Sequence, residues 1–536
     1  MSFLGKYASD RGLKVSEFLN LAATVEDILS LPSKLYKLSL IGSLSQEDSD
    51  KLYEILHPPM TSKPKGDGWA AKIVKEFFQA PFRDKNNEVQ VILDYIKACI
   101  ANHNSPPYIS LVQSSGCGKT RTLRELSRKV RTVYVNMRSS TSTGYPPRSK
   151  QAVSVLFGGL DNLDWSQIED ELVDRLSKCV ISALHNLPDP AQDTQQGLFM
   201  SDVIANEFWN FPSLPGERSI SASQGEIVLI VIDEARALLD TAALLHGALP
   251  DGDRDENMFL CYCRALEIVS RKWPNIFSIL VDTSSRVANF APSAALDPSA
   301  RFRLGTSRIY EPYILSGYFD ALKPPSWKET ENLELKSSSK DYLLAGRPLV
   351  AELATDRMEL DFLSAKLNGG YQFPLSSKGA LSHALCRLAT AICPSHPSAS
   401  ELVANYMCTL LTTNVKRDEL IVSYVAEPKL AIAAARVWST GTSLSDEILP
   451  ALQSSLTTGL LSQGVRGELV AQIILLHAFD AVCLAHKLDP GSAVPLVDVL
   501  HQLLPRDSNI DIHEAVPELL RHSKVCSPLF LHPQFS

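Results

Sequence analysis

The sequence predicts an α/β fold in which a parallel sheet is flanked by helices, with a helical amino-terminal region before it and a mostly helical carboxyl-terminal domain after it. Three observations support this prediction. Short β-prone runs alternate with helical patterns between about 105 and 340, which is typical of parallel sheets. The first of these runs enters a glycine-containing loop that opens a helix. Beyond about 340 the strand signal fades, and apolar residues recur at helical spacing.

Four segments of the central part are predicted strands. Residues 108–112, 132–136 and 277–281 are short β-prone runs, and residues 227–232 are a continuous apolar run. An uninterrupted apolar strand is expected where both faces of a sheet are covered. Residues 121–130 have the pattern of a helix between the first two strands. A strand, a helix and a second strand in succession favour parallel pairing.

The same patterns divide the chain into regions. Residues 1–60 read as amphipathic helices, and 61–104 as a linker with helices that lead into the α/β domain at 105–340. That domain has an insertion at about 139–224, and 341–536 is a helical lid followed by a helical domain. The helices predicted outside the α/β domain and the amino-terminal region are 69–78, 89–100, 381–392, 404–412, 430–437 and 469–484.

Composition excludes several classes of protein. The chain has 536 residues, a net charge of −8 and 45% hydrophobic residues, which argues against disorder and against a globally basic nucleic-acid binder. Its ten cysteines are too few for a disulfide scaffold and form no CxxC pair. We interpret Cys261 and Cys263 as small apolar residues of a helix. We expect no membrane-spanning segment and no signal peptide, and hence a cytoplasmic or nuclear protein.

The strongest motif is a phosphate-binding loop between the first predicted strand and its helix, in the order Gln113, Ser114, Ser115, Gly116, Cys117, Gly118, Lys119, Thr120 and Arg121. Glycines let backbone N–H groups turn toward phosphate oxygens, and a helix amino terminus adds partial positive charge. Lys119 is predicted to reach the β- and γ-phosphates, and Thr120 to bind Mg²⁺. The usual pattern begins with glycine where this chain has Gln113, so entry into the loop is expected to differ. A chance match in a strand–helix turn is the alternative.

An acidic pair, Asp233 and Glu234, follows the apolar run 227–232. An aspartate at the carboxyl end of a strand is placed to hold hydrated Mg²⁺, and a neighbouring glutamate to activate the attacking water. We therefore assign Asp233 and Thr120 to the metal, and Glu234 and Lys119 to catalysis. The alternative is that Glu234 only caps the helix expected near 235–245.

Three further positions are candidates around the phosphates. Thr283, or Ser284 beside it, follows the fourth predicted strand and is placed to sense the γ-phosphate, unless this is an ordinary Ser/Thr turn. Arg301 and Arg303 are candidates to stabilise phosphate charge, unless they are simply exposed arginines. Near the start of the helical part come Gly346, Arg347, Pro348 and Leu349, whose pattern also fits a simple Gly-Pro helix start.

Two other patterns are weaker evidence of function. Residues 121–138 are rich in Lys and Arg, which indicates a solvated helix face or, alternatively, a nucleic-acid contact. Asp418, Glu427 and Lys429 form a D…ExK string, as in metal-dependent nucleases. Pro428 interrupts the string and helical pattern surrounds it, so we interpret it as coincidence.

Five stretches together resemble the fungal branch of Crinkler-type proteins, which carry a STAND/AAA-like P-loop module. They are residues 112–123, 136–147, 231–235, 277–292 and 344–349, and residues 466–472 resemble a downstream segment of the same family. The resemblance implies ATP as the nucleotide and Mg²⁺ as its metal. It also implies a lid role for Arg347 and Pro348 near the base and sugar, with Arg347 as the alternative sensor arginine.

The sequence therefore leads to three hypotheses. The first is a Mg²⁺-dependent ATPase that acts as a conformational switch or motor. The second is a nucleotide-binding scaffold with negligible turnover, whose helical regions bind protein partners. The third is the NTPase part of a DNA-processing, nuclease-associated effector. A homo-oligomer is compatible with each of them.

Overall fold

The structure is a computed structural model of the whole chain. It describes residues 69–102, 106–139, 145–186, 226–245, 256–283, 310–319, 321–322, 343–353, 357–370, 374–388, 390–414, 417, 419–438, 447–486, 488, 492, 494–503 and 524–525. The amphipathic region predicted at 1–60 lies outside these residues, as do Ser284, Arg301, Arg303 and Asp418.

Five strands form the central sheet in the order β2-β3-β4-β1-β5, and all neighbours pair in parallel. The strands are β1 (Tyr108–Val112), β2 (Arg131–Asn136), β3 (Val228–Asp233), β4 (Ile276–Asp282) and β5 (Tyr313–Ile314). The first four begin and end within one residue of the predicted segments, and the predicted α/β fold is confirmed. Because β4 lies between β1 and β3, the carboxyl ends of these three strands lie in a row at one edge of the sheet.

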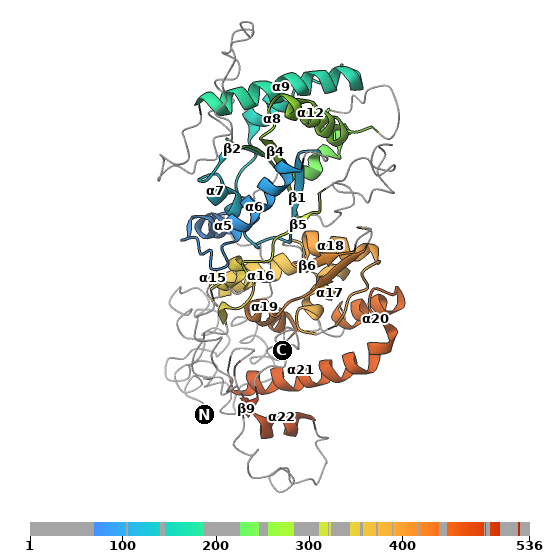
Figure 1. The fold of residues 1–536 in the computed structure, drawn as a ribbon. Helices are drawn as coiled ribbons and strands as arrows, with labels where there is room; N and C mark the ends of the chain where they lie inside the picture. Colours follow the sequence, from blue (N-terminus) through green and yellow to red (C-terminus); the bar gives the residue numbers. More distant parts are fainter. Residues whose placement is uncertain are drawn as a thin grey trace, which may run out of the picture.

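Helices cover both faces of this sheet (Figure 1). Ile230 and Ile232 pack with one set of helices, and Leu229 and Val231, which alternate with them, pack with the other. All four side chains are fully buried, and burial of each stabilises the fold by about 1.5–3 kcal/mol. The first set is α8 (Lys150–Phe157), α9 (Trp165–Asn186) and α12 (Met258–Lys272), and the second is α6 (Glu88–Ala101) and α7 (Lys119–Leu126).

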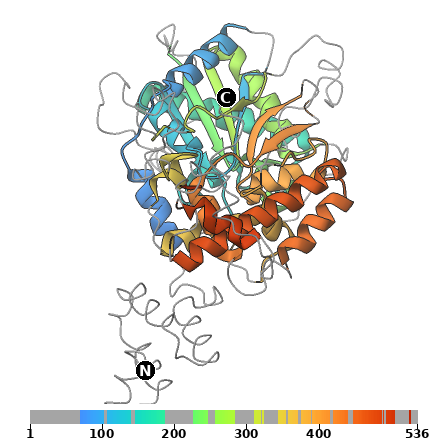
Figure 2. The same ribbon diagram turned by 90° about the horizontal axis from the view of Figure 1, so that it is seen from below.

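The carboxyl-terminal domain is largely helical and packs at the carboxyl edge of the sheet (Figures 1 and 2). Its core includes Val112, the last residue of β1, and Ile73 of α5 (Trp69–Gln79). Its elements are α15 (Pro348–Glu352), α16 (Arg357–Leu367), α17 (Ser377–Leu385), α18 (Pro397–Asn405), β6 (Thr409–Thr413), β7 (Leu420–Ser423), α19 (Pro428–Trp438), α20 (Leu449–Thr457), η6 (Gln463–Val465), α21 (Arg466–His486), β8 (Val494–Pro495), α22 (Leu496–Leu503) and β9 (Lys524–Val525).

Two local predictions are wrong. Residues 404–412 were expected to be helical, yet α18 ends at Asn405 and β6 pairs with β7 in an antiparallel hairpin. The β-branched Thr409, Thr412 and Thr413 favour the strand there. The helix expected after the acidic pair is split into a 3₁₀ turn, η2 (Ala235–Leu238), and a short helix, α11 (Thr241–Leu244).

One helix bears on the expectation that no segment spans a membrane. The helical stretch Gln463–His486 has a mean hydropathy of 1.8 over 18 residues, of which 33% are buried, so by length and composition alone it is able to cross a membrane. The core helix of a soluble protein meets the same test. Ala478, Phe479 and Val482 of this stretch are buried against a small core that includes Val499 of α22.

Candidate functional site

The phosphate loop connects the end of β1 to the start of α7, as predicted. Gly116 and Gly118 both have positive φ, at 82° and 91°, a region that favours glycine. A Cβ atom on Gly116 would lie 2.9 Å from the Leu349 Cβ, and one on Gly118 would lie 3.3 Å from the ring of Tyr318. Backbone conformation therefore favours glycine at both positions, and the close approach of Leu349 leaves no room for a side chain at Gly116.

Lys119 begins α7 and is buried inside the loop. Its ammonium donates hydrogen bonds to the backbone oxygens of Gln113 and of Ser114, the latter at 3.0 Å. Burial lowers the pKa of Lys119, while Cys117, then Asp233 and the other nearby acidic groups act in the opposite direction. The lysine therefore faces the space that the loop encloses. Cys117 is buried beside it, with its sulfur 3.6 Å from the Ser114 hydroxyl.

Thr120 and Asp233 lie together, although 113 positions separate them in the chain. The Thr120 hydroxyl donates to Asp233 Oδ2 at 3.0 Å, and the Glu234 N–H donates to Oδ1 at 2.9 Å. Burial of its carboxylate, and then the negative charge of Glu234, raise the pKa of Asp233. Hydrogen bonds from the hydroxyls of Tyr134 and Thr120 act in the opposite direction. In the described residues no group of three His, Cys, Asp or Glu could hold a metal. A hydroxyl, one carboxylate and phosphate oxygens are what a phosphate-bound Mg²⁺ uses.

The sequence analysis missed Tyr134 of β2, which completes this cluster. Its hydroxyl donates to Asp233 Oδ2 at 2.6 Å, and the Asn136 side-chain amide donates to Tyr134 Oη at 3.3 Å. Asn136 also donates to the backbone oxygen of Pro146, which fixes its amide. The signal in the sequence was the polar Asn136 at the end of a buried strand, at the edge where ligands bind to parallel sheets.

Glu234 is held by two arginines. It adopts a left-handed backbone conformation, with φ 58° and ψ 45°. Its carboxylate accepts a hydrogen bond from Arg138 at 3.1 Å and another from Arg236 at 2.8 Å. Its side chain makes no capping hydrogen bond to η2, so the alternative that Glu234 only caps the next helix is wrong.

Lys366 of α16 adds a cation from the helical domain. Burial lowers the pKa of Lys366, nearby Arg138 lowers it further, and Glu234 acts in the opposite direction. Charge interactions in proteins weaken with distance, so Lys366 must lie close to Arg138 and Glu234 for these groups to shift its pKa. The Lys366 ammonium also lies 5.5 Å from the centre of the Phe362 ring. Nothing in the sequence pattern connected Lys366 with the acidic pair.

The end of β4 lies between the phosphate loop and the acidic pair. Thr283 directly follows the strand there and is half-buried, and its role as a phosphate sensor stays a prediction. Asp282 before it is buried and accepts a hydrogen bond from the Arg236 N–H at 2.8 Å. The second phosphate candidate, Arg301, lies outside the described residues.

Arg347 does not point toward a space for nucleotide, which argues against its predicted sensor role. It is fully buried, and its five N–H groups all have partners. The guanidinium pairs with Glu427 at 2.7 Å and donates to the Ser114 hydroxyl and the Ser115 backbone oxygen, both at 2.9 Å. Arg347 thus holds the outer side of the loop.

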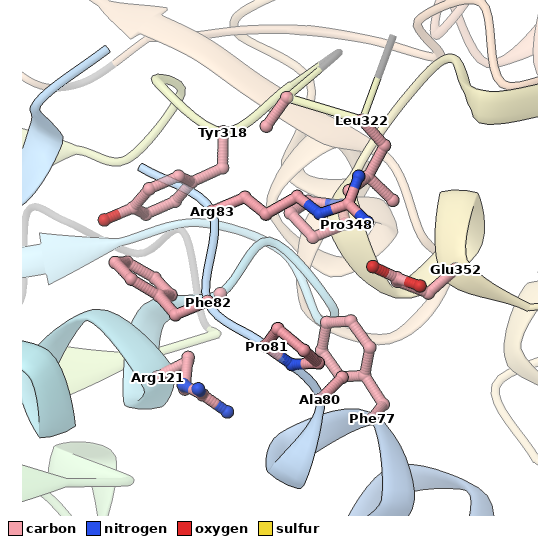
Figure 3. Close-up of a pocket in the computed structure, with 12 residues that line it drawn as sticks. Phe77, Ala80, Pro81, Phe82, Arg83, Arg121, Tyr318, Leu322, Pro348 and Glu352 are labelled. Atoms are coloured by element: carbon pink, nitrogen blue, oxygen red, sulfur yellow. The ribbon is translucent and has the colours of Figure 1, made fainter. Parts of the chain in front are cut away.

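A pocket opens beside Gly118 and Arg121 (Figure 3). The cavity has a volume of about 40 Å³, much smaller than the several hundred Å³ typical of small-molecule sites, so a ligand larger than a few atoms requires it to widen. The Phe82 and Tyr318 rings meet edge to face at 5.4 Å on one side, and Pro348 lies across from them. The lining residues are Phe77, Ala80, Pro81, Phe82, Arg83, Gly118, Arg121, Tyr318, Ala321, Leu322, Pro348 and Glu352.

The basic stretch and the nuclease-like string have structural explanations. Arg121 and Arg128 both pair with Glu125, and Arg131 pairs with Glu226, so much of this positive charge is neutralised locally. Glu427 is the partner of Arg347. Lys429 donates to the backbone oxygens of Ala351, at 2.6 Å, and of Leu353, at the carboxyl end of α15. Glu427 and Lys429 are both buried and bonded to other groups, and Asp418 lies outside the described residues, so the interpretation of the string as coincidence stays a prediction.

Two family models match the chain. Residues 84–209 and 218–315 match a domain of unknown function, DUF8735, and residues 373–528 match a second domain of unknown function, DUF8736. No curated protein matches. One solved structure, "Structure of Drosophila ORC bound to DNA", is similar at 10% sequence identity with a TM-score of 0.20, over 83% of this chain and 80% of that chain. The first family model thus spans the α/β domain from α6 to β5, and the second spans the helical domain from just before α17.

Proposed function

We propose that the chain is a Mg²⁺-dependent P-loop ATPase that acts as a conformational switch, as its resemblance to Crinkler-type STAND/AAA-like modules implies. The supporting observation is the placement of Lys119, Thr120 and Asp233 within one cluster at the carboxyl edge of a parallel sheet. This edge is where ligands bind to open α/β sheets. A lysine, a hydroxyl and a carboxylate in that arrangement suit a nucleotide triphosphate with its metal.

We assign a place in the site to each part of the nucleotide. The phosphates bind in the loop, where they replace backbone oxygens as partners of the Lys119 ammonium. Thr120 and Asp233 are the residues that would hold Mg²⁺, which would neutralise charge on the phosphates. The base would bind beside Gly118, where Phe82, Tyr318 and Pro348 offer apolar and aromatic surface, and the small cavity there would widen to admit it.

Turnover requires Glu234 to leave its two arginines. A carboxylate whose two oxygens accept hydrogen bonds from Arg138 and Arg236 has neither oxygen available to orient a water molecule. In the proposed mechanism the phosphates attract these arginines and Lys366, which releases Glu234 to orient the attacking water. ATP bound at the loop would also attract Lys366 of α16, and this shared contact would draw the α/β domain and the helical domain together.

The test is Mg²⁺-dependent phosphate release from ATP by the full chain. We expect turnover by the wild type, loss of nucleotide binding in Lys119→Ala, and retained binding with at least about 100-fold slower turnover in Glu234→Gln. Glu267→Gln on the exposed surface of α12 is the matched control and should behave as the wild type. Background release by wild type and Glu234→Gln alike would refute the ATPase.

A nucleotide-binding scaffold is the second candidate, because Glu234 is paired on both carboxylate oxygens. In that case wild type and Glu234→Gln bind Mg²⁺-ATP equally, and neither releases phosphate. Loss of binding in Lys119→Ala separates this outcome from a chain that binds no nucleotide at all.

Location and partners remain part of the proposal. We propose a reducing compartment, the cytoplasm or nucleus, because the nine cysteines among the described residues are all free. We propose protein partners bound through the helical domain. A Mg²⁺-dependent plasmid-nicking assay tests the nuclease-associated alternative, which unchanged plasmid would dismiss.

A further inference from the structure

Gln113, which stands where most phosphate loops have glycine, connects three separate segments. It is fully buried. Its side-chain oxygen accepts hydrogen bonds from the N–H groups of Ser114 at 2.9 Å and of Leu410 at 3.0 Å. Its amide nitrogen donates to the backbone oxygens of Leu315 at 3.1 Å and of Leu410 at 2.9 Å. All of the hydrogen-bonding capacity of the amide is therefore used.

This amide pairs with Leu410 as a neighbouring strand would, because it both donates to and accepts from the same residue. Leu410 belongs to β6 of the helical domain, and Leu315 directly follows β5 of the sheet. The phosphate loop is thus joined through one side chain to the edge of the sheet and to the hairpin formed by β6 and β7 (Figure 1).

The helical domain also holds the outer side of the loop. Arg347 donates to the Ser115 backbone oxygen at 2.9 Å, and the Leu349 N–H donates to the Gly116 backbone oxygen at 3.2 Å. Each of these oxygens shares a planar peptide unit with the next N–H group, so a peptide that turns its N–H toward phosphate must also turn its oxygen. Reorientation of the loop therefore acts directly on the helical domain.

We propose that Gln113 is a positioning residue that transmits occupancy of the phosphate loop to the β6–β7 hairpin. This inference rests on the proposed nucleotide binding and names its route. Phosphate binding fixes the Ser114 N–H and its neighbours, and the Gln113 amide orders β6 with them. A glycine at position 113 would still allow a phosphate loop, since glycine is the usual residue there, but it would remove the connection.

The experiment is hydrogen exchange at the backbone amides of β6 and β7, with and without a non-hydrolysable Mg²⁺-ATP analogue. In the wild type we expect the analogue to slow exchange in both strands by about threefold or more. In Gln113→Gly and in Gln113→Met, which keeps the side-chain length, we expect weaker binding because buried groups lose their partners, but at saturating analogue we expect no effect on exchange in β6 and β7. Gln167→Met, at the exposed start of α9, is the matched control and should retain the effect.

Exchange in β3 and β4 reports whether each variant keeps the sheet intact. If the wild type binds no nucleotide, the proposed function fails and the coupling fails with it. If the wild type binds but exchange in the hairpin is unchanged, the coupling alone is wrong. The coupling is also wrong if the Gln113 variants keep the wild-type change in hydrogen exchange. It is wrong as well if they lose nucleotide binding while the sheet stays intact, because Gln113 would then act only within the phosphate site.

Discussion

The buried pair of Arg347 and Glu427 allows a quantitative test of how the helical domain depends on its contact with the phosphate loop. Arg347 is fully buried, and the Glu427 side chain is 2% exposed. Removal of one partner leaves the other charge buried and uncompensated, which typically costs about 3–5 kcal/mol. Arg347→Met additionally removes donors from the backbone oxygens of Ser115 and Met407. We therefore expect about 5 kcal/mol for this variant and about 3 kcal/mol for Glu427→Leu.

The double variant Arg347→Met/Glu427→Leu should lose much less than the sum. Replacement of both charges by apolar groups is often neutral or stabilising, and the backbone oxygens left without donors cost about 1–3 kcal/mol. The expected coupling free energy is therefore at least about 3 kcal/mol, which corresponds to more than about 100-fold in an opening equilibrium.

Native-state hydrogen exchange in α19 is a suitable assay, because that helix begins next to Glu427 and is almost entirely buried. Local exchange avoids the assumption that a chain of several domains unfolds in one step. The matched control is Arg264→Met, which removes an exposed ion pair with Glu256 and should cost less than about 1 kcal/mol. If the single variants and the double variant are additive within about 0.5 kcal/mol, the two charges do not act as a unit and the reasoning is refuted.

Three further predictions concern the acidic site and the helical core. Tyr134→Phe removes a donor that lowers the pKa of Asp233, so half-saturation of nucleotide binding should need about fivefold more Mg²⁺, and more at lower pH; an unchanged Mg²⁺ titration would exclude this role. Arg138→Ala removes one of the two arginines on Glu234 and should raise basal phosphate release about threefold or more, whereas slower release would place Arg138 among the groups that stabilise the transition state. Burial lowers the pKa of His383 to about 4, so the folded chain binds fewer protons than the unfolded chain between about pH 6.5 and 4. As the pH falls from about 6.5 to 4, the free energy of unfolding should therefore decrease by about 1.4 kcal/mol per pH unit, and it should level off at lower pH. Thermal melts should show a weaker pH dependence in His383→Gln.

Local sequence pattern was sufficient for the sheet and for the phosphate loop. The apolar run that became β3 leaves little choice of structure, because five consecutive residues from Leu229 to Asp233 are buried between two layers of helices. Hairpin β6–β7 was not predicted, since a short apolar run fits a helix and a strand equally well. The two-residue strand β5 is too short to leave a periodic signal.

The contacts that surround the loop depend on partners far away in the chain, which one sequence does not reveal. Gln113 and Leu410 are 297 positions apart, and Arg347 and Glu427 are 80 positions apart. Pattern analysis identified Gln113 as a departure from the usual loop and Glu427 as part of a nuclease-like string. It could not identify the tertiary partner of either side chain.

Arg347 and Pro348 are neighbours in the chain, but in the proposed complex they lie near opposite ends of the nucleotide. Arg347 contacts the outer side of the loop, and Pro348 forms a wall of the pocket beside Gly118. One rigid dipeptide thus links recognition of the base to the shape of the phosphate site. Adenosine and triphosphate would then bind poorly as separate fragments and tightly when joined, because the first contact organises the second at a high effective concentration. Discrimination between whole nucleotides and their breakdown products would follow without an additional sensor.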